Sequence, residues 1–346
     1  MPPRPPKLPI YEPSYLEILL RIAERGPKNL SALSRELKVP KRTLHSRVNK
    51  LKERGLLKVS VMPSLKKLGL IDVYVLIDVK PSSSKLVREA LKSIDYWLRY
   101  YEIVGKYNGF FFHYLMPVNN VIDLEEYLRE LKERSLAVNY EVNVLTGRVH
   151  YLLRPYGVSE LEEVLRANPS DYSLVADKYD IIILSKLQED AFVKLSEIAR
   201  EVGKSKSLIK YHYDVHVRSR LIKGYEVITP RADPVSSVRA LIKVSFKEEG
   251  HIINYLKSLK GKPFVLDVGK EIDSNSAFTI IEVGLSDLRN AISVVTGGFS
   301  EECWVSLLLG REHRKSLPLN LFYEGGWLYP KDIYTSKLNE LTEGYK

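Results

Sequence analysis

The sequence predicts an α+β chain in which two winged helix-turn-helix domains are each followed by a ferredoxin-like βαββαβ domain. Three observations support this fold class. Apolar residues recur at helical spacing on both sides of a break at Pro40, a strand-like pattern begins after Gly55, and the same order of patterns returns 165 residues later. A chain with two such halves can form a pseudo-dimer by itself.

The first winged helix-turn-helix domain is predicted at residues 14–65, after a Pro-rich arm at 1–13. Residues 14–25 have one apolar face and are typical of a supporting helix, which Gly26 and Pro27 end. Two short helices follow, and their apolar positions are Leu30, Leu33 and Leu37, then Leu44, Val48 and Leu51. The apolar run after Gly55 predicts the strand of a wing.

The second helix of this pair carries an outward stripe of polar side chains. The stripe, at positions i, i+3, i+4 and i+7, consists of Arg42, His45, Ser46 and Asn49. Arg can grip guanine and Asn can grip adenine through paired hydrogen bonds. Lys41 and Lys50 flank the stripe and suit phosphates. We predict that these six residues contact double-stranded DNA; the alternative is a solvated charged face over a small helical core.

A βαββαβ domain is predicted at 66–155. Its expected elements are a strand at 71–79, a helix at 82–93, strands at 97–104 and 110–116, a helix at 123–134 and a strand at 140–153. In the first strand, Val73 and Val75 alternate with Asp72 and Tyr74, which predicts a half-buried strand with one solvated face.

The second half repeats the first without a gap in register. The residues Leu30, Ser31, Arg35, Glu36, Lys41, Leu56 and Lys58 return as Leu195, Ser196, Arg200, Glu201, Lys206, Leu221 and Lys223. This agreement predicts a tandem duplication. The predicted parts are a linker at 156–177 with a short helix at 159–167, a second winged helix-turn-helix at 178–231, a second ferredoxin-like domain at 232–311, and an aromatic tail at 312–346.

The second recognition helix is less regular than the first. Its candidate DNA contacts are Lys206, Ser207, Lys210 and Tyr211. Asp214 stands where the first copy has Asn49, and a carboxylate near phosphates is unfavourable. We therefore expect this copy to bind DNA more weakly or to read another sequence, with a purely structural role as the alternative. The aromatic tail is expected to pack on its own domain, or else to cover a sheet edge or another chain.

Charge and composition favour an anionic partner. The net charge of +10 indicates nucleic acid before membrane, and no apolar run approaches the ~18 residues of a membrane span. The N-terminus lacks the apolar segment of a signal peptide, so a cytoplasmic location is expected. No cofactor is predicted.

Metal-binding patterns are weak in this sequence. Cys303 is the single cysteine, which excludes an internal disulfide and a cysteine-based zinc site, and we expect it to be a small core residue. His212 and His216 could share a helix face, but two aligned histidines without a third ligand are weak evidence for zinc. We therefore predict no metal site.

The stretch LKVPKRTLHSRVNKLKERGLLK resembles the helix-turn-helix of Lrp/AsnC regulators. The positions that carry the resemblance are Thr43, Leu44, Arg47, Val48, Leu51, Gly55, Leu56 and Leu57. The segments PSLKKLGL and VGKYNG are also similar to that family, and together the match covers most of 14–154. The resemblance implies a transcription regulator whose βαββαβ domains pair, here within one chain, and often bind a small-molecule effector such as an amino acid. A further homodimer is left open.

In that family the sheet turn usually reads Gly-x-Tyr-Asp, and this chain has Asn108 at the acidic position. The resemblance places a candidate ligand site at Gly105, Tyr107 and Asn108. The alternative is a tight turn in which Gly and Asn accept unusual backbone angles.

Two other classes of protein remain as alternatives. Siroheme decarboxylases resemble Lrp/AsnC chains with a degenerate DNA-binding half, and the stretch WLRYYEIVGKYNGFFFHY, with Arg99, Tyr100 and His113, is similar to their tetrapyrrole-facing strands. The histidine usual before the Tyr-Asn pair is missing, and the first recognition helix is intact, so we expect that the chain is not an enzyme. An architectural DNA-coating protein would use the same charge without reading bases.

Overall fold

The computed structural model describes residues 13–150, 168–228, 237–297 and 301–343. The arm at 1–12 and the helix expected at 159–167 lie outside the described residues. Contacts divide the chain into two compact units, one formed by 1–64, 152–154 and 183–237, the other by 65–151, 155–182 and 238–346. No helix among the described residues is long and apolar enough to cross a membrane.

The first unit begins with the winged helix-turn-helix that the sequence predicts. Its elements are α1 (Pro13–Arg25), the 3₁₀ turn η2 (Pro27–Asn29), α2 (Leu30–Glu36), α3 (Lys41–Glu53) and the wing strand β1 (Lys58–Pro63). The apolar positions Leu44, Val48 and Leu51 of α3 are buried, as expected from their spacing. Pro40 precedes α3, and Gly55 follows it with a left-handed φ of 66°, which only glycine adopts without strain.

The second winged helix contains an irregular recognition segment. Its elements are α7 (Lys178–Glu189), α8 (Leu195–Glu201), α9 (Lys206–Tyr211), the π-helix η7 (His212–Leu221) and β6 (Ile222–Ile228). A π-helix has i→i+5 hydrogen bonds and is rare, so the segment equivalent to α3 changes its helical pitch after six residues. The irregular apolar pattern of this segment therefore coincides with an irregular helix, which is α-helical at first and π-helical afterwards.

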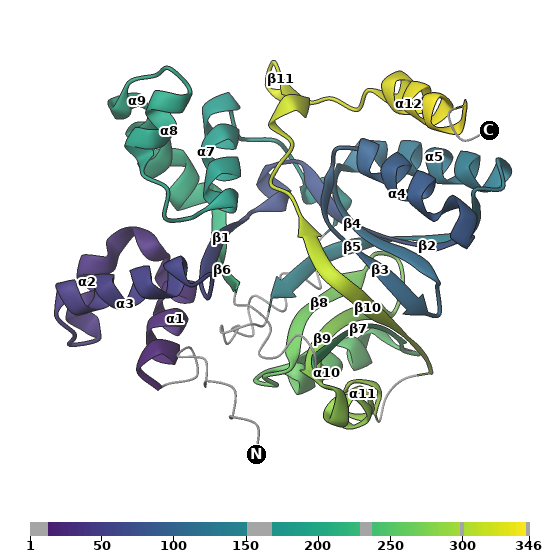
Figure 1. Ribbon diagram of the computed structural model, residues 1–346, viewed down its shortest axis with the longest axis horizontal. Helices are drawn as coiled ribbons and strands as arrows, with labels where there is room; N and C mark the ends of the chain where they lie inside the picture. Colours follow the sequence, from purple (N-terminus) through teal and green to yellow (C-terminus); the bar gives the residue numbers. More distant parts are fainter. Residues whose placement is uncertain (1–12, 151–167, 229–236, 298–300, 344–346) are drawn as a thin grey trace. The chain divides into compact units, whose positions relative to one another are not determined.

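The two wings pair with each other. Strands β1 and β6 form an antiparallel two-stranded sheet from the pair Lys58–Ile228 to the pair Pro63–Ile222. Figure 1 shows this ribbon between the two groups of helices of the unit. The pairing occupies a backbone edge of each wing, so it links the two winged helices within one chain.

The second unit contains two βαββαβ domains, as predicted. The first is β2 (Leu70–Val79), α4 (Ser84–Ser93), β3 (Trp97–Gly105), β4 (Gly109–Pro117), α5 (Val121–Glu133) and β5 (Ala137–His150). The second is β7 (Ser237–Ser245), α10 (Glu249–Leu259), β8 (Val265–Glu271), β9 (Ser276–Gly284), α11 (Leu288–Thr296) and β10 (Glu302–Arg314). The same order of elements thus occurs twice, and the duplication itself remains a prediction. β10 passes the boundary expected at residue 311.

The eight strands close into one barrel in the order β10-β3-β4-β2-β5-β8-β9-β7. Strand β5 joins β8, and β10 joins β3, so each half supplies the neighbour that the other lacks. The helices α4, α5, α10 and α11 lie on the outside (Figure 1). The interior holds an apolar cluster from both halves, with Tyr74, Tyr101, Phe111, Leu241, Phe278 and Leu308 among its members.

The expectation that β2 is half-buried was wrong, because the sheet closes into a barrel. Asp72 and Tyr74 were expected on a solvated face, but both are buried, because that face of β2 lines the barrel interior. Its opposite face, with Val73 and Val75, is buried as well. Local alternation could not reveal a second sheet that covers the polar side of the strand.

The C-terminal segment packs on the first βαββαβ domain. It contains β11 (Phe322–Tyr323), β12 (Gly326–Trp327) and α12 (Lys331–Glu343), and α12 contacts α4. The indole of Trp327 donates to the carbonyl of Leu68 at 2.7 Å, and the hydroxyl of Tyr96 donates to the carbonyl of Leu328 at 2.7 Å. The tail therefore packs within its own compact unit, on the βαββαβ domain of the first half.

Cys303 is exposed near the start of β10, so the expectation that it is a core residue was also wrong. Its neighbour Trp304 carries the inward-facing side chain, and alternation along the strand turns Cys303 outward.

Gly105 lies where β3 meets β10, opposite Ser306. Its φ is 140°, and a Cβ atom there would lie 2.5 Å from the carbonyl oxygen of Val305. We predict that Gly105→Ala lowers the free energy of unfolding of the barrel unit by roughly 1–3 kcal/mol. Urea unfolding followed by tryptophan fluorescence measures this loss, because all three tryptophans, Trp97, Trp304 and Trp327, lie in this unit. Gly250→Ala is the control, since its Cβ would meet nothing within 4 Å; equal losses in both variants would contradict the prediction.

Candidate functional site

The predicted DNA-reading side chains of α3 lie on the side of the helix away from its buried residues. Lys41, Arg42, Ser46, Asn49 and Lys50 are exposed, and His45 is half-buried. These positions share one face because the helix buries Leu44, Val48 and Leu51 on the other. The structure therefore brings the six predicted residues together, while their contact with DNA remains a prediction.

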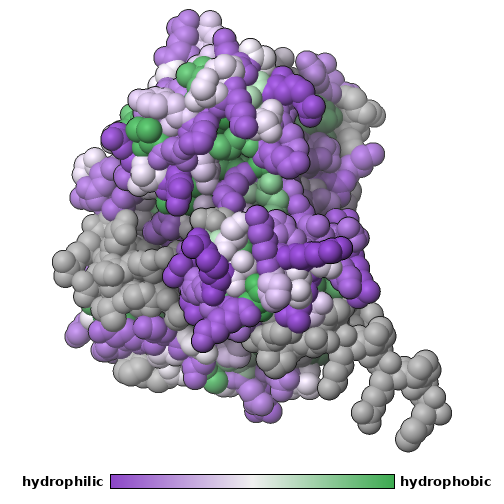
Figure 2. All heavy atoms as spheres, turned by 90° about the vertical axis from the view of Figure 1, so that its left-hand side faces the viewer, coloured by the Kyte–Doolittle hydropathy of each residue, from purple (hydrophilic) through white to green (hydrophobic). Residues whose placement is uncertain are grey.

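The three basic residues among them are open to an external anion. Lys41, Arg42 and Lys50 make no ion pair within 4 Å in the part of the chain that the structure describes, whereas Arg21 and Arg25 of α1 pair with Glu36. Figure 2 shows mainly hydrophilic side chains over the face turned to the viewer, with hydrophobic residues only in separate spots. A phosphate-binding face needs exposed basic side chains that are not neutralised by carboxylates, and Lys41, Arg42 and Lys50 meet this condition among the described residues.

The second recognition segment is also exposed but differently charged. Lys206, Ser207, Lys210 and Tyr211 are all exposed on α9. The ammonium group of Lys210 lies 2.5 Å from the carboxylate of Asp214, one turn further along. The pair partly neutralises the charge that α9 offers, which fits the expectation of weaker or different DNA binding.

The predicted effector turn is engaged in contacts within the domain. The hydroxyl of Tyr107 donates to Glu141 at 2.7 Å, and the backbone N–H of Asn108 donates to Asp78. Position 105 requires glycine, because the backbone there lies too close to β10 to leave room for a Cβ atom. These contacts are those of a tight turn; a ligand at Gly105, Tyr107 and Asn108 stays a prediction.

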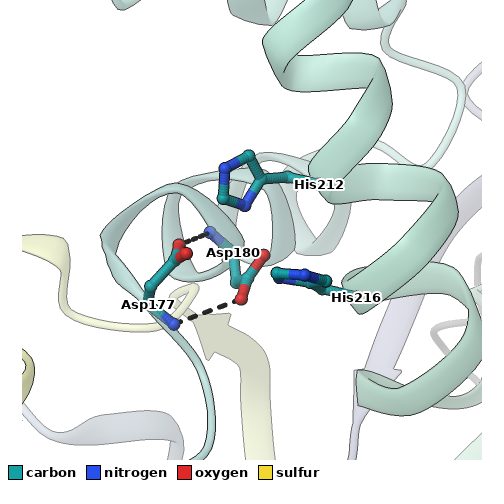
Figure 3. Close-up of side chains that lie close together, drawn as sticks. All are labelled: Asp177, Asp180, His212 and His216. Atoms are coloured by element: carbon teal, nitrogen blue, oxygen red, sulfur yellow. Dashed lines mark hydrogen bonds between the residues drawn. The ribbon is translucent and has the colours of Figure 1, made fainter.

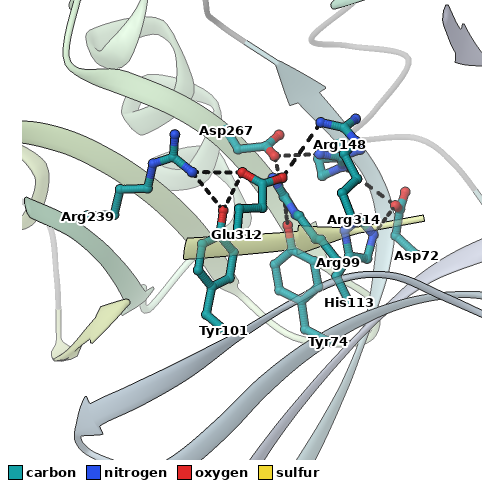
Figure 4. Close-up of polar contacts among 10 residues, drawn as sticks. All are labelled: Asp72, Tyr74, Arg99, Tyr101, His113, Arg148, Arg239, Asp267, Glu312 and Arg314. Atoms are coloured by element: carbon teal, nitrogen blue, oxygen red, sulfur yellow. Dashed lines mark hydrogen bonds and ion pairs between the residues drawn. The ribbon is translucent and has the colours of Figure 1, made fainter. Parts of the chain in front are cut away.

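A charge network inside the barrel was not identified by the sequence analysis. We define it by ten residues from strands of both halves (Figure 4), namely Asp72, Tyr74, Arg99, Tyr101, His113, Arg148, Arg239, Asp267, Glu312 and Arg314. A sequence signal did exist, because Asp72, Arg99 and His113 interrupt otherwise apolar strands. Arg99 and His113 were noted only as part of the resemblance to siroheme decarboxylases.

One side of the network is organised by two aspartates. Arg99 donates to Asp267 at 2.5 Å, and Arg148 also donates to this carboxylate. Asp72 contacts Nε2 of His113 at 2.7 Å and lies 3.5 Å from Nε of Arg148. Arg148 therefore links the two carboxylates.

The other side is organised by Glu312. Its carboxylate accepts hydrogen bonds from the hydroxyl of Tyr101 and from Arg239, each at 2.7 Å. Arg239 also donates to Glu282 at 2.5 Å, and Arg314 lies 3.7 Å from Glu312. Buried charges are tolerated only when they are paired in this way, because an unpaired charge would lose its hydration without compensation.

Burial also sets the protonation states. It lowers the pKa of His113 to about 4, although the hydrogen bond to Asp72 acts in the opposite direction. Burial tends to raise the pKa of Asp72, but the hydrogen bond from His113 and the charge of Arg148 outweigh it, so the pKa is lowered. Above pH 4, His113 is therefore neutral and donates from Nε2 to an ionised Asp72.

Three buried nitrogens of the network lack a hydrogen-bond partner among the described residues, namely Nε of Arg99, Nε of Arg148 and Nδ1 of His113. The two arginine nitrogens are donors, and Nδ1 of His113 is an acceptor in the tautomer that donates from Nε2. The network can therefore accept a further polar group near these atoms, while its arginines are already paired with protein carboxylates.

Comparisons with known proteins support the helix-turn-helix assignment. A helix-turn-helix domain family matches residues 12–60. Uncharacterised HTH-type transcriptional regulators of Pyrococcus furiosus and Pyrococcus horikoshii are 33% and 32% identical over 79 residues, which is 22% of this chain and 53% of each relative. The chain thus spans about half the length of these relatives.

Over nearly the whole chain the fold is that of a siroheme decarboxylase, NirDL. Its crystal structure covers 94% of this chain and 99% of its own length, with a TM-score of 0.58 and 15% identity. The co-complex with an iron-uroporphyrin III analogue has a TM-score of 0.59, with coverage of 96% and 100% and the same identity. This likeness establishes the fold: two helix-turn-helix domains with ferredoxin-like sheets.

The comparison corrects the expectation that the chain is not an enzyme. That expectation rested on an intact first recognition helix and on a missing histidine near the effector turn. A siroheme decarboxylase has this fold over nearly the whole chain, so the fold gives no ground for excluding catalysis.

The lowered pKa of His113 predicts a pH dependence of stability. The unfolded chain binds a proton near the ordinary histidine pKa of about 6.5, and the folded chain only near pH 4. The free energy of unfolding should therefore fall as the pH drops from about 6.5 to about 4, by roughly 3 kcal/mol for this group. Urea unfolding at a series of pH values, followed by tryptophan fluorescence, measures the effect.

His113→Asn should flatten this pH profile, because the asparagine side chain can still donate to Asp72 but does not titrate. His45→Asn, in the other unit, is the matched control and should keep the full slope. A profile that is the same in His113→Asn and in the native chain would contradict the assignment.

Proposed function

We propose that this chain is a sequence-specific DNA-binding transcription regulator of the Lrp/AsnC type. The observation that carries the proposal is the exposed face of α3, which combines base-reading side chains with lysines that have no ion-pair partner among the described residues. It lies within the segment that matches a helix-turn-helix family, and the curated relatives are described as transcriptional regulators.

In this mechanism α3 enters the major groove. Arg42 bonds to guanine and Asn49 to adenine, while Lys41 and Lys50 hold phosphates and fix the register. His45 and Ser46 contribute the remaining contacts of the stripe. The second segment, α9 with its π-helical continuation, presents different side chains, so the site on DNA should consist of two unlike halves.

The barrel unit takes the place that two sheets from separate chains have in a homodimer. A small-molecule effector would act on this unit, and the turn at Gly105, Tyr107 and Asn108 is its candidate position. An effector that binds one conformation of the chain more tightly than another would change the DNA affinity by at most this difference in effector affinity. Pairing of two chains into a further homodimer would extend the DNA site.

The test compares a duplex selected by the protein with a random duplex of the same length. A sequence-specific regulator should bind its selected site about 10³-fold or more tightly at physiological salt. Equal affinity for the two duplexes would overturn the proposal and favour an architectural coating protein.

We predict that substitutions in α3 separate base reading from phosphate binding. Arg42→Ala should weaken the selected duplex by about 1–3 kcal/mol, relax the preference at one position and leave random DNA less affected. Lys50→Ala should weaken both duplexes and lower the salt slope by about one. Fluorescence anisotropy over a salt series measures both quantities.

Lys85→Ala is the matched control for Lys50→Ala, since Lys85 is an exposed lysine on α4 of the other unit. It should change neither affinity nor salt slope. Equal losses on selected and random DNA for Arg42→Ala would refute its assignment as a base reader.

A siroheme decarboxylase-like activity is the second candidate. The fold covers nearly the whole of such an enzyme, and the barrel holds a network of arginines, His113 and tyrosines that could pair with the carboxylates of a tetrapyrrole. A ligand would have to replace Asp267 and Glu312 as partners of these arginines. Each decarboxylation would release carbon dioxide and put a proton in place of the carboxylate.

Anaerobic incubation with siroheme, followed by mass spectrometry of the tetrapyrrole, tests this candidate. A stepwise loss of carbon dioxide that disappears in Arg99→Leu would support it. Unchanged siroheme and no tetrapyrrole absorption on the purified chain would exclude it.

A further inference from the structure

The ribbon that joins the two winged helices of the first compact unit has an internal symmetry. Its central residue pairs exchange with one another when positions are shifted by the 165 residues of the sequence repeat. They are Val59–Val227, which exchanges with Met62–Gly224, and Ser60–Glu226, which exchanges with Val61–Tyr225. Two antiparallel strands with this property have a two-fold axis through the centre of the ribbon. The ribbon therefore relates one winged helix to the other by a local two-fold axis.

The turn after the first helix of each winged helix packs on the wing of the other. The backbone N–H of Ala191, which follows α7, donates to the carbonyl of Val59 in β1 at 2.8 Å. Gly26 holds the corresponding position after α1, and a Cβ atom there would overlap the ring of Tyr225 in β6. The two turns thus make reciprocal contacts, as the two-fold axis of the ribbon requires.

Two lysines of the first winged helix add side-chain links to the second. Lys28 donates to the carbonyl of Val193, which is the position equivalent to its own, so this contact lies near the axis. Lys52 lies 3.2 Å from the carboxylate of Asp190 and 4.2 Å from the ring centre of Phe192. Burial lowers the pKa of Lys28 to about 8, although the charge of Asp190 acts in the opposite direction. The ammonium group of Lys28 is therefore enclosed at the junction.

These links matter because a two-stranded ribbon alone is only marginally stable in water. The reciprocal turns and the lysines hold the winged helices on both sides of the ribbon, so the two cannot swing freely about it.

The two recognition segments differ although the framework that holds them is symmetric. Asn49 of α3 is replaced in the second segment by Asp214, whose carboxylate pairs with Lys210. Figure 3 shows the rings of His212 and His216 at the start of the π-helix η7, with their centroids 5.1 Å apart. Symmetric placement of unlike side chains should select two unlike sequences.

We propose that the two winged helices form one rigid surface, which fits a DNA duplex with two unlike half-sites in inverted orientation at a single spacing. This inference rests on the proposed regulator function. A two-fold axis in a protein requires half-sites that run in opposite directions along the duplex. Winged helices on a flexible connection would instead accept direct repeats and several spacings.

The rigid arrangement is tested on the full chain without DNA. Arg35 of α2 and Arg200 of α8 are exposed and occupy equivalent positions. Spin labels on Arg35→Cys and Arg200→Cys, in a Cys303→Ser background because Cys303 is exposed, report the distance between the winged helices by double electron–electron resonance. One narrow distance distribution is expected. A broad distribution in this labelled chain would overturn the proposal.

The lysine links are tested in the same labelled chain. Lys28→Ala combined with Lys52→Ala removes both links and should broaden the distribution. Arg54→Ala is the matched control, because Arg54 is exposed beside Lys52 and has no ion pair among the described residues, and it should keep the distribution narrow. Circular dichroism checks that the variants are folded. An unchanged distribution in the folded double variant would overturn the role given to the lysines.

Orientation and spacing are tested with the duplex that the chain selects. It is compared with a duplex in which one half-site is reversed and with one in which five base pairs, about half a helical turn, are inserted between the halves. Each change should weaken binding at least ~10-fold, toward the affinity for random DNA. Equal affinity for the selected and the rearranged duplexes would overturn this inference and leave the regulator function standing. Equal affinity for selected and random DNA would overturn the regulator function, and the spin-label distances would still decide whether the winged helices form one surface.

Discussion

Closure of the eight-stranded barrel is the constraint on which the rest of the second unit depends. The pairs β5–β8 and β10–β3 join the two βαββαβ halves, so neither half has a free sheet edge at these positions. Because the sheets face each other, β2 is buried on both sides, and polar residues that an open sheet would expose become internal. The charge network is the consequence. Buried Arg99 pairs with Asp267 of the other half, whereas buried Asp72 is paired by His113 and Arg148 of its own half.

The first unit joins two helix-turn-helix domains whose recognition segments differ. The β1–β6 ribbon joins them, and the recognition segments differ in charge and in backbone: α3 is a regular helix, whereas α9 passes into a π-helix and pairs Lys210 with Asp214. Siroheme decarboxylase NirDL shares this fold, which shows that the architecture alone does not decide between reading DNA and catalysis. The decision lies in specific side chains: the exposed stripe of α3 favours DNA, and the barrel network is the part that an enzyme would use.

The sequence predicted the order of elements because each helix and strand has its own apolar period. Leu44, Val48 and Leu51 place the buried face of α3, and therefore its exposed stripe, without any knowledge of the partners. Sequence reasoning failed where burial comes from distant residues. Asp72 and Tyr74 were expected to be solvated but are buried, because strands of the second half cover them. Cys303 was expected in the core but is exposed, because its side chain points away from the barrel interior. The charge network likewise joins residues that lie far apart in the chain.

The central claim is that one chain reads DNA with two unlike recognition segments. Selection of bound duplexes from a random pool by the purified chain, followed by sequencing, tests it most directly. The account predicts an asymmetric enriched motif, with one half changed by substitutions in α3 and the other by substitutions in α9. A palindrome would mean that two chains use the same segment, and no enrichment would mean that bases are not read; either result would contradict the account.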